Sequence, residues 1–292
     1  MGALDPLAKV LLHEAPEAFA RLALGHEVVI RKVRADDTEL PALSRRMDRL
    51  VRVEVDGEDE PCWIHVEVQA SWKSDVPRRV FEYWSMAHRR RPKLLSLVIC
   101  LARGVKQGDP RGAYDVVVRG RRRLLFEFDV VRVWEDLQAE HLLANGPPGL
   151  LPLLPYTAGA SEQLVDRGLR VLSEVSDDHL RRELRVALVT LAERAFTGGG
   201  WLGKIAREEL MESTTWKEIG EQFRLEGRRE LLAELLSERL GAATAARFLP
   251  RLRPATEETL AQVGKLLAGR HPDLELADAL DRSLPPEARD DS

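Results

Sequence analysis

The run Leu94–Leu101 constrains the fold more than any other segment of the chain, because seven of its eight residues are apolar. A strand that is apolar on both faces must be covered on both sides, which is typical of the inner strands of α/β sheets. The preceding segment, 76–91, has an apolar stripe at helical spacing, begins after Ser74-Asp75 and ends at Pro92. Together these two segments predict helices packed against a buried sheet.

The other signals in the first half of the chain agree with this architecture. Two strand-like runs, Leu50–Val55 and Cys62–Ala70, flank the turn-rich sequence Asp-Gly-Glu-Asp-Glu-Pro and predict a hairpin. One helix, divided at Pro16, is expected over residues 5–25. Shorter strand signals lie at 28–33, 114–118 and 124–134. We therefore expect an α/β sandwich with a mixed sheet.

The strongest break in the chain is Gly146-Pro147-Pro148-Gly149, so we place the end of the first domain near residue 157. Helical periodicity dominates beyond it. The sequence Thr215-Trp216-Lys217-Glu218 has the form of a capping box and opens a long helix that runs to about Leu240. The predicted organisation is a core at 1–157, a helical region at 158–283 and a disordered tail at 284–292.

The composition excludes several classes of protein. The two cysteines, Cys62 and Cys100, lie in separate strand-like runs, which argues against a cysteine zinc site and a disulfide-stabilised secreted domain. The longest nearly apolar run, Leu94–Ala102, is shorter than the ~20 residues that a membrane helix needs. Acidic residues near the N-terminus argue against a secretion signal. We expect a cytoplasmic protein that does not contact a membrane.

The charge of the chain is nearly balanced, with 44 basic and 48 acidic residues and a net charge of −4. Residues 1–150 carry a net charge of +1 and the remainder −5. Basic clusters occur in the first half, at 45–46, 78–79, 89–91 and 121–123. Such clusters are most often solvated surface, and they become candidates for phosphate contact only with other evidence of nucleic-acid binding.

The second strand of the expected hairpin has one unusual face, because successive side chains of a strand point to opposite sides. The apolar face holds Cys62, Ile64, Val66 and Val68, and the polar face holds Trp63, His65, Glu67 and Gln69. Matching the apolar face to the valines of the first strand requires paired residue numbers to sum to an odd number. If the turn is centred between Glu58 and Asp59, Asp48 lies opposite Gln69 and diagonal to Glu67.

Carboxylates at such diagonal positions on neighbouring strands can converge on one cation. An all-oxygen site of this kind suits Mg²⁺ or Mn²⁺. The bound ion could lower the pKa of a water and offset charge that builds on a phosphate. The alternative is a solvated hairpin face without a ligand, which would use the same residue types.

The order of the motifs resembles a known nuclease family. Asp48, followed by a strand, a turn and His65-Val-Glu67-Val-Gln69, is similar to the core motif of the PD-(D/E)xK nuclease superfamily. More specifically, it resembles the Rpn-type recombination-promoting nucleases, also described as transposase-like. It covers about residues 5–270 and continues through Asp75–Tyr83, Phe126–Trp134, Pro148–Pro152, Met211–Ser213 and Leu231–Gly241.

The resemblance implies a restriction-endonuclease-like core that hydrolyses DNA phosphodiester bonds with Mg²⁺ or Mn²⁺. Asp48 and Glu67 would bind the metal, and Gln69 would position the attacking water. Most of the superfamily has a lysine at the position of Gln69, and glutamine supplies no charge. A catalytically weak or inactive DNA-binding protein with the same fold is therefore an alternative.

Residues around this motif also have two interpretations each. Arg79 and Tyr83 lie four apart in a helix and so share a face. They would bind nucleic acid through a phosphate, or contact the metal-site carboxylates, or pack the helix on the sheet. Glu14 would be an additional acidic ligand or a solvated helix residue, and His65 is expected to be a hydrogen-bonded structural histidine.

A third interpretation is an interaction scaffold that dimerises through the helix at 214–240. Its apolar stripe comprises Leu231, Leu232, Leu235, Leu236 and Leu240. Packing of this stripe within the chain's own helical region explains it equally well, so a homodimer remains one of two alternatives.

Overall fold

The computed structural model describes residues 4–25, 27–36, 49–102, 110–196, 200–252, 255–269 and 272–285. The chain divides into two compact units, Ala3–Glu218 and Ile219–Ser292. The helix α9 (Thr214–Leu240) runs across the division.

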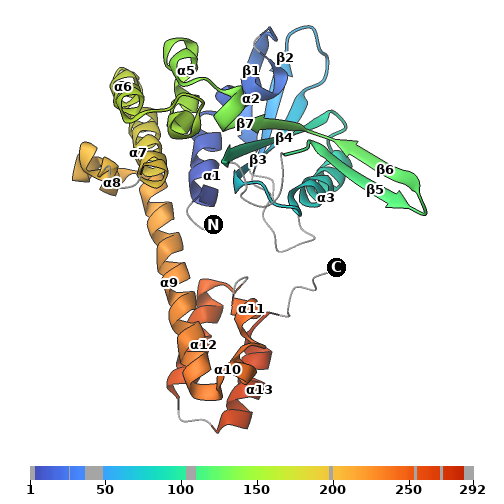
Figure 1. Ribbon diagram of the computed structural model, residues 1–292, viewed down its shortest axis with the longest axis vertical. Helices are drawn as coiled ribbons and strands as arrows, with labels where there is room; N and C mark the ends of the chain where they lie inside the picture. The colour runs from blue at the N-terminus through green and yellow to red at the C-terminus, as the bar shows by residue number, and fades with distance from the viewer. Residues whose placement is uncertain are drawn as a thin grey trace. The chain divides into compact units, whose positions relative to one another are not determined.

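The first unit is built on a mixed sheet of five strands in the order β1-β2-β3-β4-β7. The strands β1, β2 and β3 are antiparallel to one another, and β4 and β7 continue the sheet in parallel with β3 (Figure 1). Their bounds are β1 (Ile30–Asp36), β2 (Arg49–Val55), β3 (Cys62–Ser71), β4 (Leu94–Ala102) and β7 (Asp129–Arg132). The expectation of an α/β fold with a mixed sheet is confirmed.

The β2–β3 hairpin has the predicted parity but not the assumed turn centre. Arg49 pairs with Val66 and Val53 with Cys62. The residue numbers of each pair add up to an odd number, as predicted, and the apolar faces of the two strands match. The turn is centred between Gly57 and Glu58 rather than between Glu58 and Asp59. The physical reason is Gly57, whose φ of 79° is favourable only for a residue without a Cβ. Asp48 lies outside the described residues.

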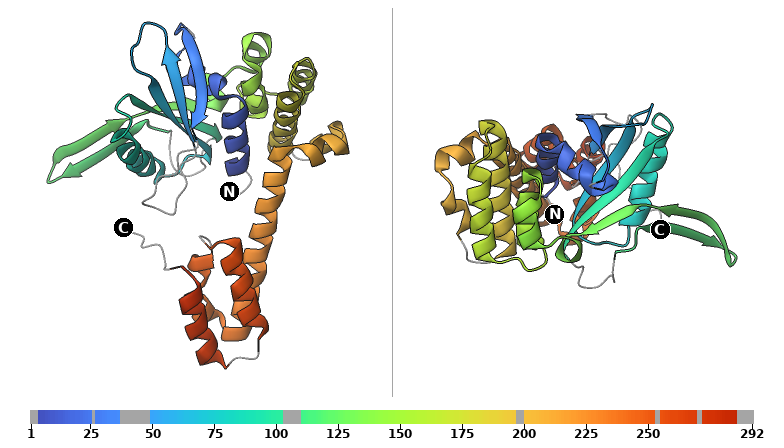
Figure 2. Two further views of the ribbon diagram at one scale, coloured as in Figure 1. Left: turned by 180° about the vertical axis from the view of Figure 1, so that it is seen from behind. Right: turned by 90° about the horizontal axis from the view of Figure 1, so that it is seen from above.

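Helices cover both faces of this sheet (Figures 1 and 2). The helices α1 (Leu4–Glu14) and α2 (Pro16–Leu24) pack on the face of β2 and β3 that holds Val51, Ile64 and Val66, all of them fully buried. The predicted interruption at Pro16 is where α2 begins. The helix α3 (Val76–His88) covers the opposite face, which holds Glu67.

The segment predicted as one strand at 124–134 contains parts of two strands and a short helix. Its first part belongs to β6 (Arg121–Glu127), which forms a hairpin with β5 (Ala113–Val118) that projects beyond the main sheet (Figure 1). The chain breaks at Phe128, whose side chain is buried, and then joins β4 as β7. The helix α4 (Val133–Asp136) follows.

The proline-rich segment after α5 (Ala139–Asn145) is buried structure rather than a linker. It forms a 3₁₀ helix, η1 (Pro148–Tyr156), whose leucines are at most 3% exposed and which packs against α6 and α7. The described chain is helical beyond residue 157, as expected. The first helices after that residue belong to the same compact unit as the sheet, which extends to Glu218. They are α6 (Glu162–Ser173), α7 (Asp178–Ala195), η2 (Trp201–Lys204) and α8 (Arg207–Glu212).

The second unit is a small helical assembly with its own core. It contains most of α9 and the helices α10 (Ala242–Ala245), α11 (Leu249–Leu252), α12 (Glu257–Ala268) and α13 (Asp273–Ser283). The buried Arg251 donates to the carbonyl oxygens of Leu284 and Pro285 and to the Asp281 carboxylate. Leu284 is 4% exposed in this core, so the ordered chain continues past the predicted start of the tail.

Candidate active site

The polar face of β3 forms the candidate site. His65, Glu67 and Gln69 point to the side of the sheet covered by α3, and they are 0%, 1% and 9% exposed. The sequence pattern predicted a half-buried hairpin face. The structure instead covers this face with α3, and Glu67 and Gln69 are hydrogen-bonded to each other in a site of low exposure.

The Glu67 carboxylate is the centre of the site. Its Oε1 atom accepts hydrogen bonds from Gln69 Nε2 at 2.7 Å and from Arg79 Nε and Nη2 at 3.0 and 2.5 Å. Arg79 also donates to the Asp75 carboxylate at 2.8 Å, from the start of the same helix. Burial by itself would lower the pKa of Arg79, but the adjacent Glu67 outweighs it and raises the pKa above its ordinary value. Arg79 therefore remains a cation at neutral pH.

His65 lies beside this pair as a neutral group. Its ring meets the Tyr83 ring edge to face, with centroids 5.6 Å apart, and its Nδ1 is 3.5 Å from Ser96 Oγ. Burial and the nearby Arg79 cation lower the pKa of His65 to about 4. An uncharged imidazole in contact with Ser96 and Tyr83 agrees with the structural role expected for it.

The two residues predicted to share one face of α3 differ in their surroundings. Arg79 lies on the Glu67 carboxylate, which was one of its two site interpretations. Tyr83 is 7% exposed and packs with Leu50, Ala87 and Leu94, which corresponds to the helix-to-sheet packing alternative.

The remaining candidates lie away from Glu67 or outside the described chain. Asp48 is in a segment that the structure does not describe, although its neighbour Arg49 is paired with Val66. Glu14 is neither solvated nor on the polar face of β3. Its side chain is 15% exposed and its carboxylate lies 3.3 Å from His179 Nε2 of α7.

The arginine clusters also differ in their surroundings. Arg91 is buried, with its guanidinium 4.5 Å from the Trp63 ring centroid. The cluster at 121–123 is exposed on β6, and the turn before it contains the exposed Arg119 at a φ of 53°. The β5–β6 hairpin therefore presents a basic surface.

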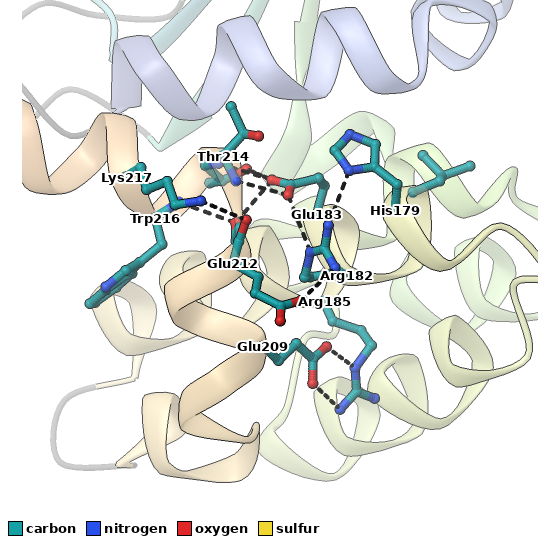
Figure 3. A network of polar contacts seen from close by, with 12 residues as sticks. His179, Arg182, Glu183, Arg185, Glu209, Glu212, Thr214, Trp216 and Lys217 are labelled. Carbon is teal, nitrogen blue, oxygen red and sulfur yellow. Dashed lines mark hydrogen bonds and ion pairs between the residues drawn. The ribbon is translucent and has the colours of Figure 1, made fainter.

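A second buried carboxylate was missed by sequence reasoning. Glu183 of α7 is 1% exposed and accepts hydrogen bonds from Ser213 Oγ, from the Thr214 N–H, and from the N–H and Oγ1 of Thr215 (Figure 3). Burial tends to raise its pKa, but these four hydrogen bonds outweigh burial and lower it. Glu183 thus binds the start of α9, where a capping box at 215–218 was predicted.

No group of three or more His, Cys, Asp or Glu side chains that could hold a metal occurs in the part of the chain that the structure describes. Within that same part, no helix is long and apolar enough to cross a membrane. Comparison with known proteins adds no assignment: no family model matches the chain, and no curated protein or solved structure matches it.

Proposed function

We propose that this protein is a metal-dependent nuclease of the PD-(D/E)xK type that hydrolyses DNA phosphodiester bonds. The observation that carries the proposal is the buried Glu67 on the inner strand β3, beside Gln69 and under Arg79 of α3. A mixed sheet in which this strand follows an antiparallel neighbour and precedes a helix and a parallel strand suits that superfamily's core.

The burial of Glu67 supports a functional role. Removing a carboxylate from water costs several kcal/mol before its partners offset that cost, and apolar residues in place of a buried ion pair are often neutral or stabilising. Gln69 and Arg79 both donate hydrogen bonds to this carboxylate, and the buried His65 lies on the same face of β3. Buried polar groups that are clustered despite the cost of desolvation are typical of sites that bind a ligand or catalyse a reaction.

The described donors suit Mg²⁺ in kind. Glu67 offers a carboxylate, and proteins commonly hold Mg²⁺ through one or two carboxylates while it keeps several waters. Asp48, which directly precedes β2 in sequence, would supply the second carboxylate. Arg79 competes with a cation for Glu67, since it already donates to Oε1 at 2.5 Å.

Each residue has a defined part in the proposed mechanism. When bound, Mg²⁺ or Mn²⁺ lowers the pKa of a water and offsets charge on the phosphate. Asp48 and Glu67 would hold the ion, and the Gln69 amide oxygen would accept a hydrogen bond from the attacking water and so orient it. Arg79, with 18% of its side chain exposed, would release part of its contact with Glu67 and donate to a DNA phosphate oxygen.

The β5–β6 hairpin would add contacts to the DNA backbone. Arg119, Arg121 and Arg123 are exposed there, and Arg122 is also exposed but paired with Asp115. Arginine–phosphate contacts carry affinity without reading sequence, so we propose low sequence specificity. A role in recombination would follow from the family resemblance.

A nuclease-fold protein that binds DNA without cleaving it is the second candidate. It is favoured by Gln69, which donates to Glu67 and brings no positive charge, and by the ion pair that already neutralises Glu67. The two candidates share the same site and differ in whether Glu67 takes a cation.

A cleavage assay tests the proposal. Supercoiled and linear duplex DNA are incubated with the full chain in Mg²⁺, Mn²⁺ or EDTA, beside Asp48→Ala and Glu67→Ala. Nicking that requires metal and disappears in both variants supports the nuclease. No cleavage by folded wild type, together with salt-sensitive DNA binding, would replace it with the second candidate.

A further inference from the structure

The helix α9 has an exposed face that the proposed nuclease site does not use. Leu231 is 55% exposed and Leu235 is 38% exposed, whereas Leu232 and Leu236 are buried in the core of the second unit. The apolar stripe predicted for this helix therefore divides in two. One part packs within the chain, as the packing alternative held, and the other faces solvent.

Charged residues of opposite sign lie on either side of the exposed leucines. Residues three, four and seven positions apart share one face of a helix. The face that contains Leu231 holds, in chain order, Arg224, Gly227, Arg228, Leu231, Glu234, Leu235 and Glu238, all of them exposed. It is basic before Leu231 and acidic after it.

The basic half keeps a net positive charge despite its contacts. Arg224 and Arg228 lie 3.5 and 3.7 Å from the same carboxylate oxygen of Glu257, so two cations share one anion. Both guanidinium groups are on exposed side chains, 63% and 42% exposed. This half therefore remains able to attract a further acidic group.

We propose that α9 pairs antiparallel with α9 of a second copy of this chain, centred on Leu231. Counting outward from Leu231 places Arg224 opposite Glu238 and Arg228 opposite Glu234, and two-fold symmetry repeats each pair. The same count places Gly227 opposite Leu235. A Cβ built on Gly227 meets nothing within 4 Å, which leaves room for the partner's leucine.

Self-complementarity is the reason to choose a second copy as the occupant. A two-fold interface requires a surface that matches itself after rotation, in charge and in size. This face does so in the antiparallel direction. A parallel pair would instead oppose Arg224 to Arg224 and Glu238 to Glu238, which like-charge repulsion disfavours. The proposal does not depend on the nuclease activity.

Sedimentation velocity of the full chain over a wide concentration range tests the association. We expect a monomer–dimer equilibrium that weakens as salt rises, and Leu231→Glu should weaken it by at least about tenfold. Met211→Glu is the matched control, because Met211 is 58% exposed but lies on α8. A monomer at every concentration, or a dimer that Leu231→Glu leaves unchanged, would overturn the proposal.

Oxidative cross-linking tests the direction of the pair. Leu231→Cys should cross-link to itself, since the symmetry axis passes at that position. Arg224→Cys and Glu238→Cys should each fail alone and cross-link when mixed, because positions 224 and 238 lie about 21 Å apart along one helix. The unsubstituted chain, with Cys62 and Cys100, gives the background. Efficient self-linking of Arg224→Cys would show a parallel pair and refute the proposed geometry.

Discussion

Replacing Arg79 with methionine should destabilise the first unit, because it leaves the Glu67 carboxylate buried without its cation. The Glu67 side chain is 2% exposed and that of Arg79 is 18% exposed. Removing one partner of a buried ion pair costs about 3–5 kcal/mol. The partial exposure of Arg79 and the hydrogen bond that Gln69 still donates place the expected loss near the lower end, about 3 kcal/mol.

Urea unfolding followed by tryptophan fluorescence measures this loss in the right unit. All six tryptophans precede Ile219, so their emission reports on Ala3–Glu218 alone. The control is Arg78→Met, since Arg78 pairs with Glu82 in an exposed i,i+4 contact that is worth less than about 1 kcal/mol. The double variant Arg79→Met/Glu67→Gln should recover most of the stability.

The pH dependence of Arg79→Met has a defined sign. Without its cation, the buried Glu67 carboxylate is disfavoured by burial relative to its protonated form. The folded state then binds more protons, and the variant should lose less stability than wild type as the pH falls. Equal losses for Arg79→Met and Arg78→Met would refute the reasoning that Arg79 compensates a buried charge.

Three further predictions concern other sites. Because the pKa of His65 is lowered to about 4, its contribution to stability is complete above the unfolded value and declines as the pH falls. Through His65, the free energy of unfolding should decrease by about 2 kcal/mol between about pH 7.5 and about pH 5, as measured by urea unfolding at both pH values. The decrease should be much smaller in His65→Gln. Glu183→Ala should expose the first N–H groups of α9 and speed hydrogen exchange at Thr214 and Thr215, whereas Glu212→Ala, on an exposed carboxylate, should not. Gly57→Ala should cost about 1–2 kcal/mol in the same unfolding assay because of its positive φ, and a cost near zero would contradict the turn geometry.

Much of the first unit could be predicted because its signals are local. The apolar run at 94–101 and the alternation along 62–70 predict buried strands, and β4 and β3 occupy those segments. The parity of the hairpin follows from its two apolar faces. Its turn centre does not, because Asp56–Pro61 offers several centres of similar composition and the backbone angle of Gly57 selects one.

The candidate site was predictable only in part for a different reason. Glu67 and Gln69 share a face of one strand, which alternation determines. The contact between Glu67 and Arg79 joins a strand to a helix, and its existence depends on how α3 packs. The burial of Glu183 depends on partners 30 to 32 residues further along the chain. The only local signal was an acidic residue within an amphipathic helix.

The predicted boundary near residue 157 depended on prolines and glycines as signs of a linker. The segment also contains Leu150, Leu151, Leu153 and Leu154, and these leucines are buried. Proline prevents a regular α-helix here but permits the 3₁₀ helix η1, which packs against α6 and α7. Because η1 joins these helices to the sheet, the first compact unit continues past residue 157. It ends within α9, at Glu218, where composition changes little.

The most direct test of the account compares metal-dependent nicking of supercoiled DNA by wild type, Glu67→Gln and Glu82→Gln. Glu67→Gln keeps the size of the side chain and removes the charge, and Glu82→Gln makes the same change on the exposed carboxylate that pairs with Arg78. We expect Mg²⁺- or Mn²⁺-dependent cleavage by wild type and Glu82→Gln, and its loss in folded Glu67→Gln. Equal cleavage by the two variants would contradict the assignment of Glu67 as the centre of the active site.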